Sequence, residues 1–384
     1  MAFEFLEPLD DTFSGYIETL PEQSLGKKAL MHFSSGLPDV GEVSIAIIGV
    51  LDNRGAGNGE NKSVCLNYIR EQFYALYPGN WDKTIVDLGN IPAGNTVQDT
   101  YYVVKTIVEE LVKNKIIPLI IGGSQDITYA MYRGYDRLEQ MVNLVTIDSK
   151  FDFGKENQDI SAESYLTHII VDEPNNLFNY SNIGYQTYFN SQEEIDLIEK
   201  LYFDAYRLGD VIANATIAEP VFRDADIVSL DMQSVKSGDS GNFVNFLPNG
   251  FNGKEICTLA RYAGISDKVT CFGIFNHQGT KQESLLLAQV LWYFIEGVHY
   301  RSNEYPFDTK DNYMKYIVPM DDEEVVFYKS DKTDRWWIEV PFITGVNNKL
   351  KRNTLLPCTY DDYLGACDSG FPERLWKAQR KNII

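Results

Sequence analysis

The sequence predicts an α/β protein in which a mostly parallel sheet is covered by helices on both faces. Short apolar runs rich in Val and Ile, such as Val43–Leu51 and Ile116–Ile121, are typical of strands buried on both sides. Longer segments between them carry apolar residues at helical spacing, as Val97, Val104 and Val108 do. Strands that alternate with helices in this way predict a three-layer αβα architecture.

The alternation continues from residue 43 to residue 297. The expected strands are Val43–Leu51, Thr84–Leu88, Ile116–Ile121, Val142–Asp148, Ile227–Asp231 and Val269–Phe275. The expected helices are Lys62–Leu76, Thr96–Lys113, Asp126–Met141, Ile195–Leu208, Lys254–Tyr262 and Lys281–Gly297.

A C-terminal extension follows this α/β body. Val325–Lys329 and Arg335–Phe342 are rich in Val, Phe and Trp and flank a polar turn, which predicts a β-hairpin. Pro372 then opens an expected helix over Glu373–Lys381. We therefore expect two domains, with a boundary near Tyr300: an α/β domain over 1–300 and an extension over 301–384.

The charge of the chain restricts its partners. The formal net charge is −21, and almost all of the acidic excess lies in residues 1–300. A field of this sign repels nucleic acids and anionic membranes, so neither is expected as a partner. Clustered basic residues, including Lys349–Arg352, occur in the extension and not in the body. Two alternatives stay open for it: packing on the body's acidic surface, or docking a protein partner or a second copy of the chain.

Neither the cysteines nor the N-terminus indicates secretion. Five cysteines without a CxxC pair favour reduced thiols over a disulfide framework or a zinc site. The acidic N-terminus lacks the basic and apolar regions of a signal peptide. No apolar run approaches the ~20 residues that a membrane-spanning helix needs. We therefore expect a cytoplasmic protein without membrane insertion.

Polar loops at the ends of the expected strands are the candidate functional sites, because ligands of parallel sheets bind beyond the carboxyl ends of the strands. The glycine-rich loop Asp52–Gly59 follows the first strand. Asp148 and Asp152 bracket the end of another strand, and Asp231 ends a third. Carboxylates forced together raise each other's pKa unless a cation lies nearby. The three aspartates are therefore either separate loop residues or a cluster neutralised by a metal ion or by Lys150.

In order and content these loops resemble the ureohydrolase family of arginases, agmatinases and formimidoylglutamases, marked by GGDH, DAHxD and SxDxD motifs. The resemblance spans about Val43 to Gly297 and implies an arginase-like fold. It rests on six segments of this sequence: Arg54–Gly59, Asp87–Asn90 with Gly94–Thr96, Gly122–Gln125, Asp148–Asp152, Ser229–Gln233 and Pro248–Gly250. It also implies a two-manganese centre with a bridging hydroxide.

The metal-ligand positions that the resemblance implies are only half kept. Gln125 and Lys150 stand where the family has histidines, and Gln233 stands where it has an aspartate. The other three ligand positions keep their aspartates, as Asp148, Asp152 and Asp231. Asn276 stands where the family places a substrate-binding glutamate. The expected degenerate pocket comprises Ser124, Gln125, Asp148, Lys150, Asp152, Asp231, Gln233 and Asn276.

An ammonium at Lys150 can take the place of the metal among the aspartates. Glutamine is a poor manganese ligand, and none of the four histidines lies at an expected ligand position. We therefore expect no cofactor.

Two functions remain open. The main interpretation is a non-catalytic pseudoenzyme with a structural or protein-interaction role. The alternative is an active linear-amidine C–N hydrolase, formimidoylglutamase-like or arginase-like, with one manganese ion or a rearranged site.

Overall fold

The structure is a computed structural model that describes residues 2–57, 66–138, 140–155, 158–244, 246–304, 311–320, 324–340, 355–368 and 370–381. A nine-stranded sheet in the order β1-β3-β2-β4-β9-β8-β5-β6-β7 forms its centre, and every strand pair in it is parallel. The strands are β1 Leu30–Met31, β2 Val43–Val50, β3 Thr84–Ile91, β4 Ile117–Ile121, β5 Val142–Ile147, β6 Leu177–Tyr185, β7 Asp204–Arg207, β8 Ile227–Asp231 and β9 Cys271–Phe275.

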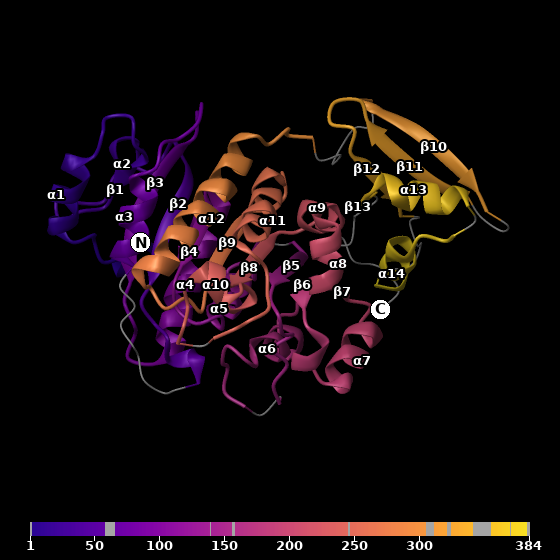
Figure 1. The fold of residues 1–384 in the computed structure, drawn as a ribbon, viewed down its shortest axis with the longest axis horizontal. Helices are drawn as coiled ribbons and strands as arrows, with labels where there is room; N and C mark the ends of the chain where they lie inside the picture. Colours follow the sequence, from indigo (N-terminus) through magenta and orange to yellow (C-terminus); the bar gives the residue numbers. More distant parts are fainter. Residues whose placement is uncertain are drawn as a thin grey trace.

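Helices cover both faces of this sheet and confirm the three-layer prediction (Figure 1). Alternate side chains of each strand enter two separate cores; Ile45 and Ile47 belong to one, and Ala46 and Ile48 to the other. The first core is closed by α1 Asp11–Thr19, α2 Leu25–Lys28, α3 Asn67–Tyr74, α8 Leu208–Ala213, α9 Glu219–Arg223, α11 Gly253–Ile265 and α12 Lys281–His299. The second is closed by α4 Val97–Lys113, α5 Ile127–Arg133, α6 Tyr165–Val171 and α7 Gln192–Lys200. A short helix, α10 Ser237–Ser240, precedes α11.

Two expected helices are wrong in their second halves. The helix predicted over Asp126–Met141 ends as α5 at Arg133, with Gly134 as its C-cap, and turns follow. The helix predicted over Ile195–Leu208 ends as α7 at Lys200, and the chain turns at Tyr202, whose φ of 57° is left-handed. The chain then forms β7, the edge strand of the sheet. The expected start of α3 at Lys62 and residues Asn58 and Gly59 of the glycine-rich loop lie outside the described residues.

The C-terminal extension is larger than the predicted hairpin. The expected strand pair is present as β11 Glu324–Ser330 and β12 Trp336–Glu339, with Phe327 opposite Ile338. Two further strands extend it to a four-stranded antiparallel sheet, β10 Tyr313–Pro319 and β13 Leu355–Cys358. A helix that was not predicted, α13 Tyr360–Cys367, precedes the expected α14 Glu373–Lys381. Phe342 and Lys349–Arg352 lie outside the described residues.

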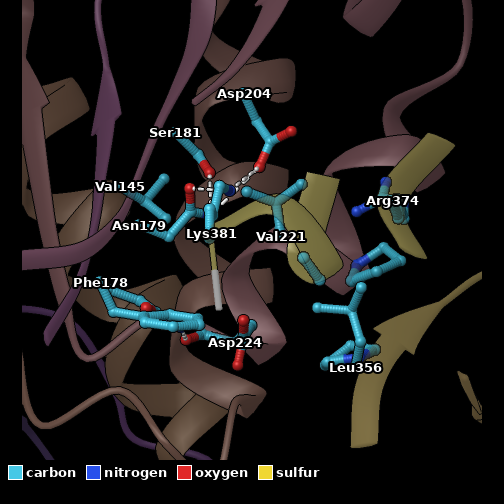
Figure 2. Close-up of a pocket in the computed structure, with 14 residues that line it drawn as sticks. Val145, Phe178, Asn179, Ser181, Asp204, Val221, Asp224, Leu356, Arg374 and Lys381 are labelled. Carbon is cyan, nitrogen blue, oxygen red and sulfur yellow. Dashed lines mark hydrogen bonds and ion pairs between the residues drawn. The ribbon is translucent and has the colours of Figure 1, made fainter. Parts of the chain in front are cut away.

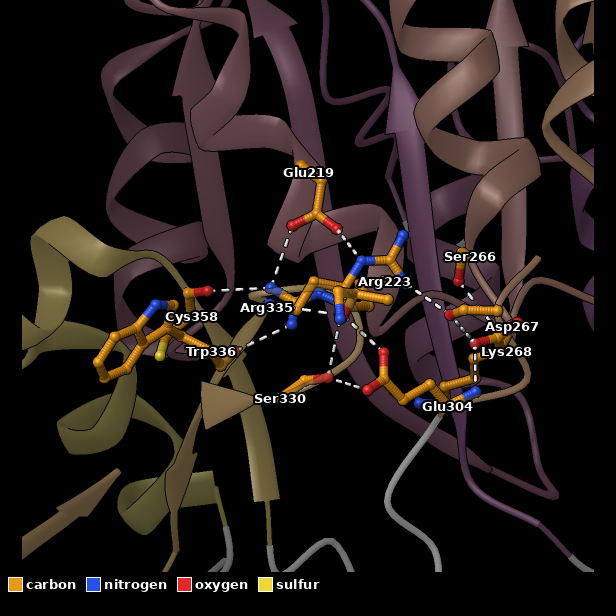
Figure 3. A network of polar contacts seen from close by, with 12 residues as sticks. Glu219, Arg223, Ser266, Asp267, Lys268, Glu304, Ser330, Arg335, Trp336 and Cys358 are labelled. Atoms are coloured by element: carbon orange, nitrogen blue, oxygen red, sulfur yellow. Dashed lines mark hydrogen bonds and ion pairs between the residues drawn. The ribbon is translucent and has the colours of Figure 1, made fainter. Parts of the chain in front are cut away.

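The extension packs on the body through buried polar contacts, which agrees with the first of the two alternatives for its basic residues. Arg223 of α9 donates hydrogen bonds to the carbonyls of Trp336 and Cys358, both at 2.9 Å (Figure 3). Arg335 of the extension pairs with Glu219 of the body at 3.3 Å. In Figure 1 the extension lies beside α9, at the end of the molecule opposite α1. None of the described helices is both long and apolar enough to cross a bilayer.

Candidate functional site

Four neighbouring strands, β4, β9, β8 and β5, bring the predicted loops together at one edge of the sheet. Gly122 and Gly123 follow β4 with φ values of 97° and 75°, a conformation that a side chain would strain. A Cβ at Gly122 would also lie 2.8 Å from the carbonyl oxygen of Val50. These two glycines let the chain turn sharply and place Ser124 and Gln125 at the edge, where both are buried.

Amide side chains hold two of the three aspartates. Gln125 Nε2 donates to Asp148 Oδ2 at 2.7 Å and to the hydroxyl of Tyr165 at 3.2 Å. Asn276 Nδ2 donates to Asp231 Oδ2 at 3.1 Å, and Asn276 Oδ1 accepts from the backbone N–H of Gln125 at 3.2 Å. The pocket is thus linked from β4 to β9, β8 and β5 by hydrogen bonds of glutamine and asparagine.

The carboxylate of the third aspartate, Asp152, is the least well compensated by hydrogen bonds. It adopts a left-handed φ of 55°, and its buried Oδ2 has no hydrogen-bond partner among the described residues. Burial and the negative charges of Asp148 and Asp231 raise the pKa of Asp152 well above its usual range. Burial likewise raises the pKa values of Asp148 and Asp231. Burial and mutual repulsion therefore favour the protonated carboxyl more in this cluster than in an isolated aspartate.

The prediction that the Lys150 ammonium lies among the aspartates is wrong. Its Nζ pairs with Glu163 Oε1 at 3.2 Å, and its side chain is 40% exposed. Only the backbone of Lys150 serves the cluster, through an N–H donated to Asp148 Oδ1 at 2.9 Å. An ammonium is costly to bury, and a route to solvent lies open here, so the side chain turns outward.

Gln233 contributes mainly through its backbone as well. Its N–H donates to Asp231 Oδ1 at 2.7 Å and fixes that carboxylate, while its own side chain is half-buried. Asp231 also accepts this bond as the N-cap of a short 3₁₀ helix, Met232–Ser234. All eight predicted residues therefore lie on the four converging loops, but Lys150 directs its charge away from the aspartates.

The four histidines are distributed over the molecule. His32 contacts a backbone carbonyl, His168 contacts Asp172, and His299 stacks on Trp81. His277 follows Asn276 and is buried with neither ring nitrogen hydrogen-bonded among the described residues. Burial lowers the pKa of His277 to about 4, so it is neutral near pH 7.

Tyr165 is the pocket residue that the sequence analysis missed. Its ring is fully buried, and its hydroxyl accepts the hydrogen bond from Gln125. A lone tyrosine in this segment carries no spacing signal in the sequence, so only the hydrogen bond identifies it.

A match to a family model decides the relationship of this chain to known proteins. Residues 44–236 match the model of the arginase family. The chain belongs to the arginase family. The match covers the strands and loops from β2 to the end of β8, and therefore the three aspartates of the pocket.

Curated relatives agree with this membership. The formimidoylglutamase of Staphylococcus aureus (strain MRSA252) is 23% identical over 242 residues, which cover 59% of this chain and 77% of that protein. The formimidoylglutamase of Macrococcus caseolyticus (strain JCSC5402) is 28% identical over 170 residues, or 43% of this chain and 53% of that protein.

Solved structures share the fold of this arginase-family chain. Trypanosoma cruzi formiminoglutamase with Mn2+ gives a TM-score of 0.62 at 16% identity, over 69% of this chain and 96% of that one. Formimidoylglutamase from Bacillus subtilis gives a TM-score of 0.60 at 16% identity, over 68% of this chain and 88% of that one. Agmatine ureohydrolase from Thermoplasma volcanium gives a TM-score of 0.56 at 17% identity, over 74% of this chain and 97% of that one.

Proposed function

We propose that this arginase-family protein has no two-manganese centre and acts in the cytoplasm by binding, in a structural or protein-interaction role, rather than by hydrolysis. The observation that carries the proposal is the hydrogen bonding of Gln125. Its amide N–H lies 2.7 Å from Asp148 Oδ2, so a donor occupies an oxygen that a metal would need. The Asn276 amide occupies an oxygen of Asp231 in the same way.

The residues present do not fit a two-manganese centre. Carboxylate oxygens suit manganese, whereas an amide N–H offers it no lone pair. Lys150 supplies no ligand because its side chain faces Glu163. Among the described residues, no group of three His, Cys, Asp or Glu side chains is placed to hold a metal ion. These observations support a pocket in which amide and backbone N–H groups, instead of metal, bind the carboxylates.

A second function, hydrolysis of a linear amidine with one manganese ion or a rearranged site, has one observation in its favour. Asp152 Oδ2 is buried without a hydrogen-bond partner among the described residues, and such an oxygen could accept a cation. The curated relatives are both named formimidoylglutamase. The cofactor would then be manganese.

For the interaction role we propose that residues 301–384 dock a protein partner or a second copy of the chain. Among the described strands, β10 is the outermost of its sheet and pairs on one side only, and it exposes Met314 and Ile317. The α13 helix exposes Tyr360 and Leu364. Exposed apolar side chains beside an open strand edge support such a surface.

The metal content of the purified protein after manganese loading tests the proposal. Urea and formamide release from arginine, agmatine and formimidoylglutamate is measured on the same sample. We expect far less than one manganese ion per chain and no release. The triple variant Gln125→His, Lys150→His, Gln233→Asp restores the family's ligand types and is expected to bind more manganese than the wild type. About two manganese ions per wild-type chain, or clear turnover, would overturn the proposal.

A further inference from the structure

A cavity of about 460 Å³ lies between the body and α14. It is on the face of the sheet that α7 covers, beside the edge strand β7. Four aromatic side chains from different segments line it: Phe151 from the loop after β5, Tyr185 from the end of β6, Phe203 from the turn before β7, and Trp376 from α14. Its size is within the range of small-molecule sites, roughly 300–1,000 Å³.

Contacts with the edge of the sheet hold the α14 wall of this cavity in place. Lys377 pairs with Asp204 at 3.2 Å, and Lys381 pairs with the same carboxylate at 3.5 Å. Trp376 stacks edge-on against Tyr202, with ring centroids 5.4 Å apart. Figure 2 shows Lys381 directed at Asp204 and Asn179 in a second cavity, which Arg374, Ala378 and Lys381 of α14 help to line. Contacts within the chain therefore position the wall.

The charges at the mouth of the cavity favour a cation. Among the described residues that line the cavity, Lys377 is the only basic one, and its ammonium is already shared between Asp204 and Glu373, which lies 2.9 Å away. Glu199 of α7 also lines the cavity, is exposed, and has no ion pair or side-chain hydrogen bond among the described residues. One uncompensated carboxylate thus stands beside aromatic rings, whose faces attract cations. The net charge of −21 adds to this attraction.

We propose that this cavity binds a small organic cation with an apolar body. The ammonium or guanidinium group pairs with Glu199 at the mouth. The apolar body packs among Phe151, Tyr185, Phe203 and Trp376. Phe151 comes from the same loop as Asp148 and Asp152, but none of the eight residues of the aspartate pocket lines this cavity. The site needs no metal, so it stands whether or not the protein is a hydrolase. It also gives the extension a role, because Trp376 supplies one wall.

The test uses ¹⁹F NMR of the full chain labelled with fluorotryptophan. The chain has five tryptophans, and Trp376→Phe assigns the resonance of the cavity. Phenethylammonium is titrated as the cation and phenethyl alcohol as its neutral counterpart of the same shape. We expect a saturable shift of the Trp376 resonance, with the ammonium binding about fivefold more tightly than the alcohol.

Two single variants locate the charge that is responsible. Glu199→Gln is expected to reduce ammonium affinity to that of the alcohol. Glu193→Gln, the same change on the same helix but away from the cavity lining, is expected to leave it unchanged. Equal affinity for both compounds, no effect of Glu199→Gln, or no saturable shift of Trp376 would each overturn the proposal.

Discussion

Replacing Arg223 by methionine is expected to destabilise the whole chain strongly. Arg223 belongs to α9 of the body, yet two of its hydrogen bonds go to carbonyls of the extension, those of Trp336 and Cys358 (Figure 3). Its guanidinium also lies 4.6 Å from the ring centroid of Trp337 and 3.0 Å from Glu219. Only 3% of its surface is exposed, so water cannot take over these contacts.

The size of the effect follows from the groups left behind. Each buried carbonyl that loses its donor costs about 1–3 kcal/mol. The lost cation–π contact adds about 1 kcal/mol or more at a desolvated site. Glu219 keeps Arg335 as a partner and adds little. The free energy of unfolding is thus expected to fall by about 3–7 kcal/mol, a large part of the 5–15 kcal/mol typical of a folded protein.

Urea unfolding followed by tryptophan fluorescence measures this change. Arg261→Met is the matched control, because Arg261 also pairs with a glutamate, Glu296 at 2.9 Å, and lies over an aromatic ring, that of Tyr300. Arg261 is 39% exposed, so its loss should cost less than about 1 kcal/mol. Equal midpoints for Arg223→Met and Arg261→Met would refute the reasoning that burial makes the Arg223 contacts strong.

Three further predictions concern single side chains. Lys150→Ala should change the melting temperature little, because its pair with Glu163 is exposed and worth at most about 1 kcal/mol; a large drop in thermal melting would mean that the lysine does neutralise the aspartates. Gln125→Ala should cost about 1–3 kcal/mol in urea unfolding, because Asp148 loses a buried donor; a loss no greater than that of Lys150→Ala would contradict this. Burial raises the pKa of Glu283 to about 7, so the wild type should lose stability as pH rises from about 4.5 to 7, when the buried carboxyl must ionise. Glu283→Gln should remove up to roughly 3 kcal/mol of this pH dependence, and parallel pH profiles of the two proteins would disprove it.

The central strands could be predicted from the sequence because they are buried on both faces and therefore almost wholly apolar. β6 lacks that signal, since Asn179, Ser181 and Asn182 interrupt it. Ser181 and Asn182 are nevertheless buried, and Asn182 donates to the carbonyl of Lys150 at 2.8 Å. Hydrogen bonds that form only in the folded sheet compensate them, and no pattern of hydrophobicity contains that information.

The convergence of the pocket loops was predictable for a different reason. Strand order and parallel direction alone place the carboxyl ends of β4, β9, β8 and β5 together. The direction of a long side chain is not set by strand order. Lys150 turned outward because Glu163, thirteen residues further along the chain, provides a solvent-exposed counter-charge. The division into two domains near Tyr300 stays a prediction.

The position of α14 along β7 has a consequence for biosynthesis. β7 is an edge strand of the sheet, and open edges invite pairing with strands of other molecules. Lys377 and Lys381 fasten α14 beside it through Asp204. The ribosome makes α14 long after β7, so the growing chain carries an uncovered edge while the extension is being translated. During that interval, neighbouring nascent chains on one messenger RNA would meet each other's β7 before the helix that shields it exists.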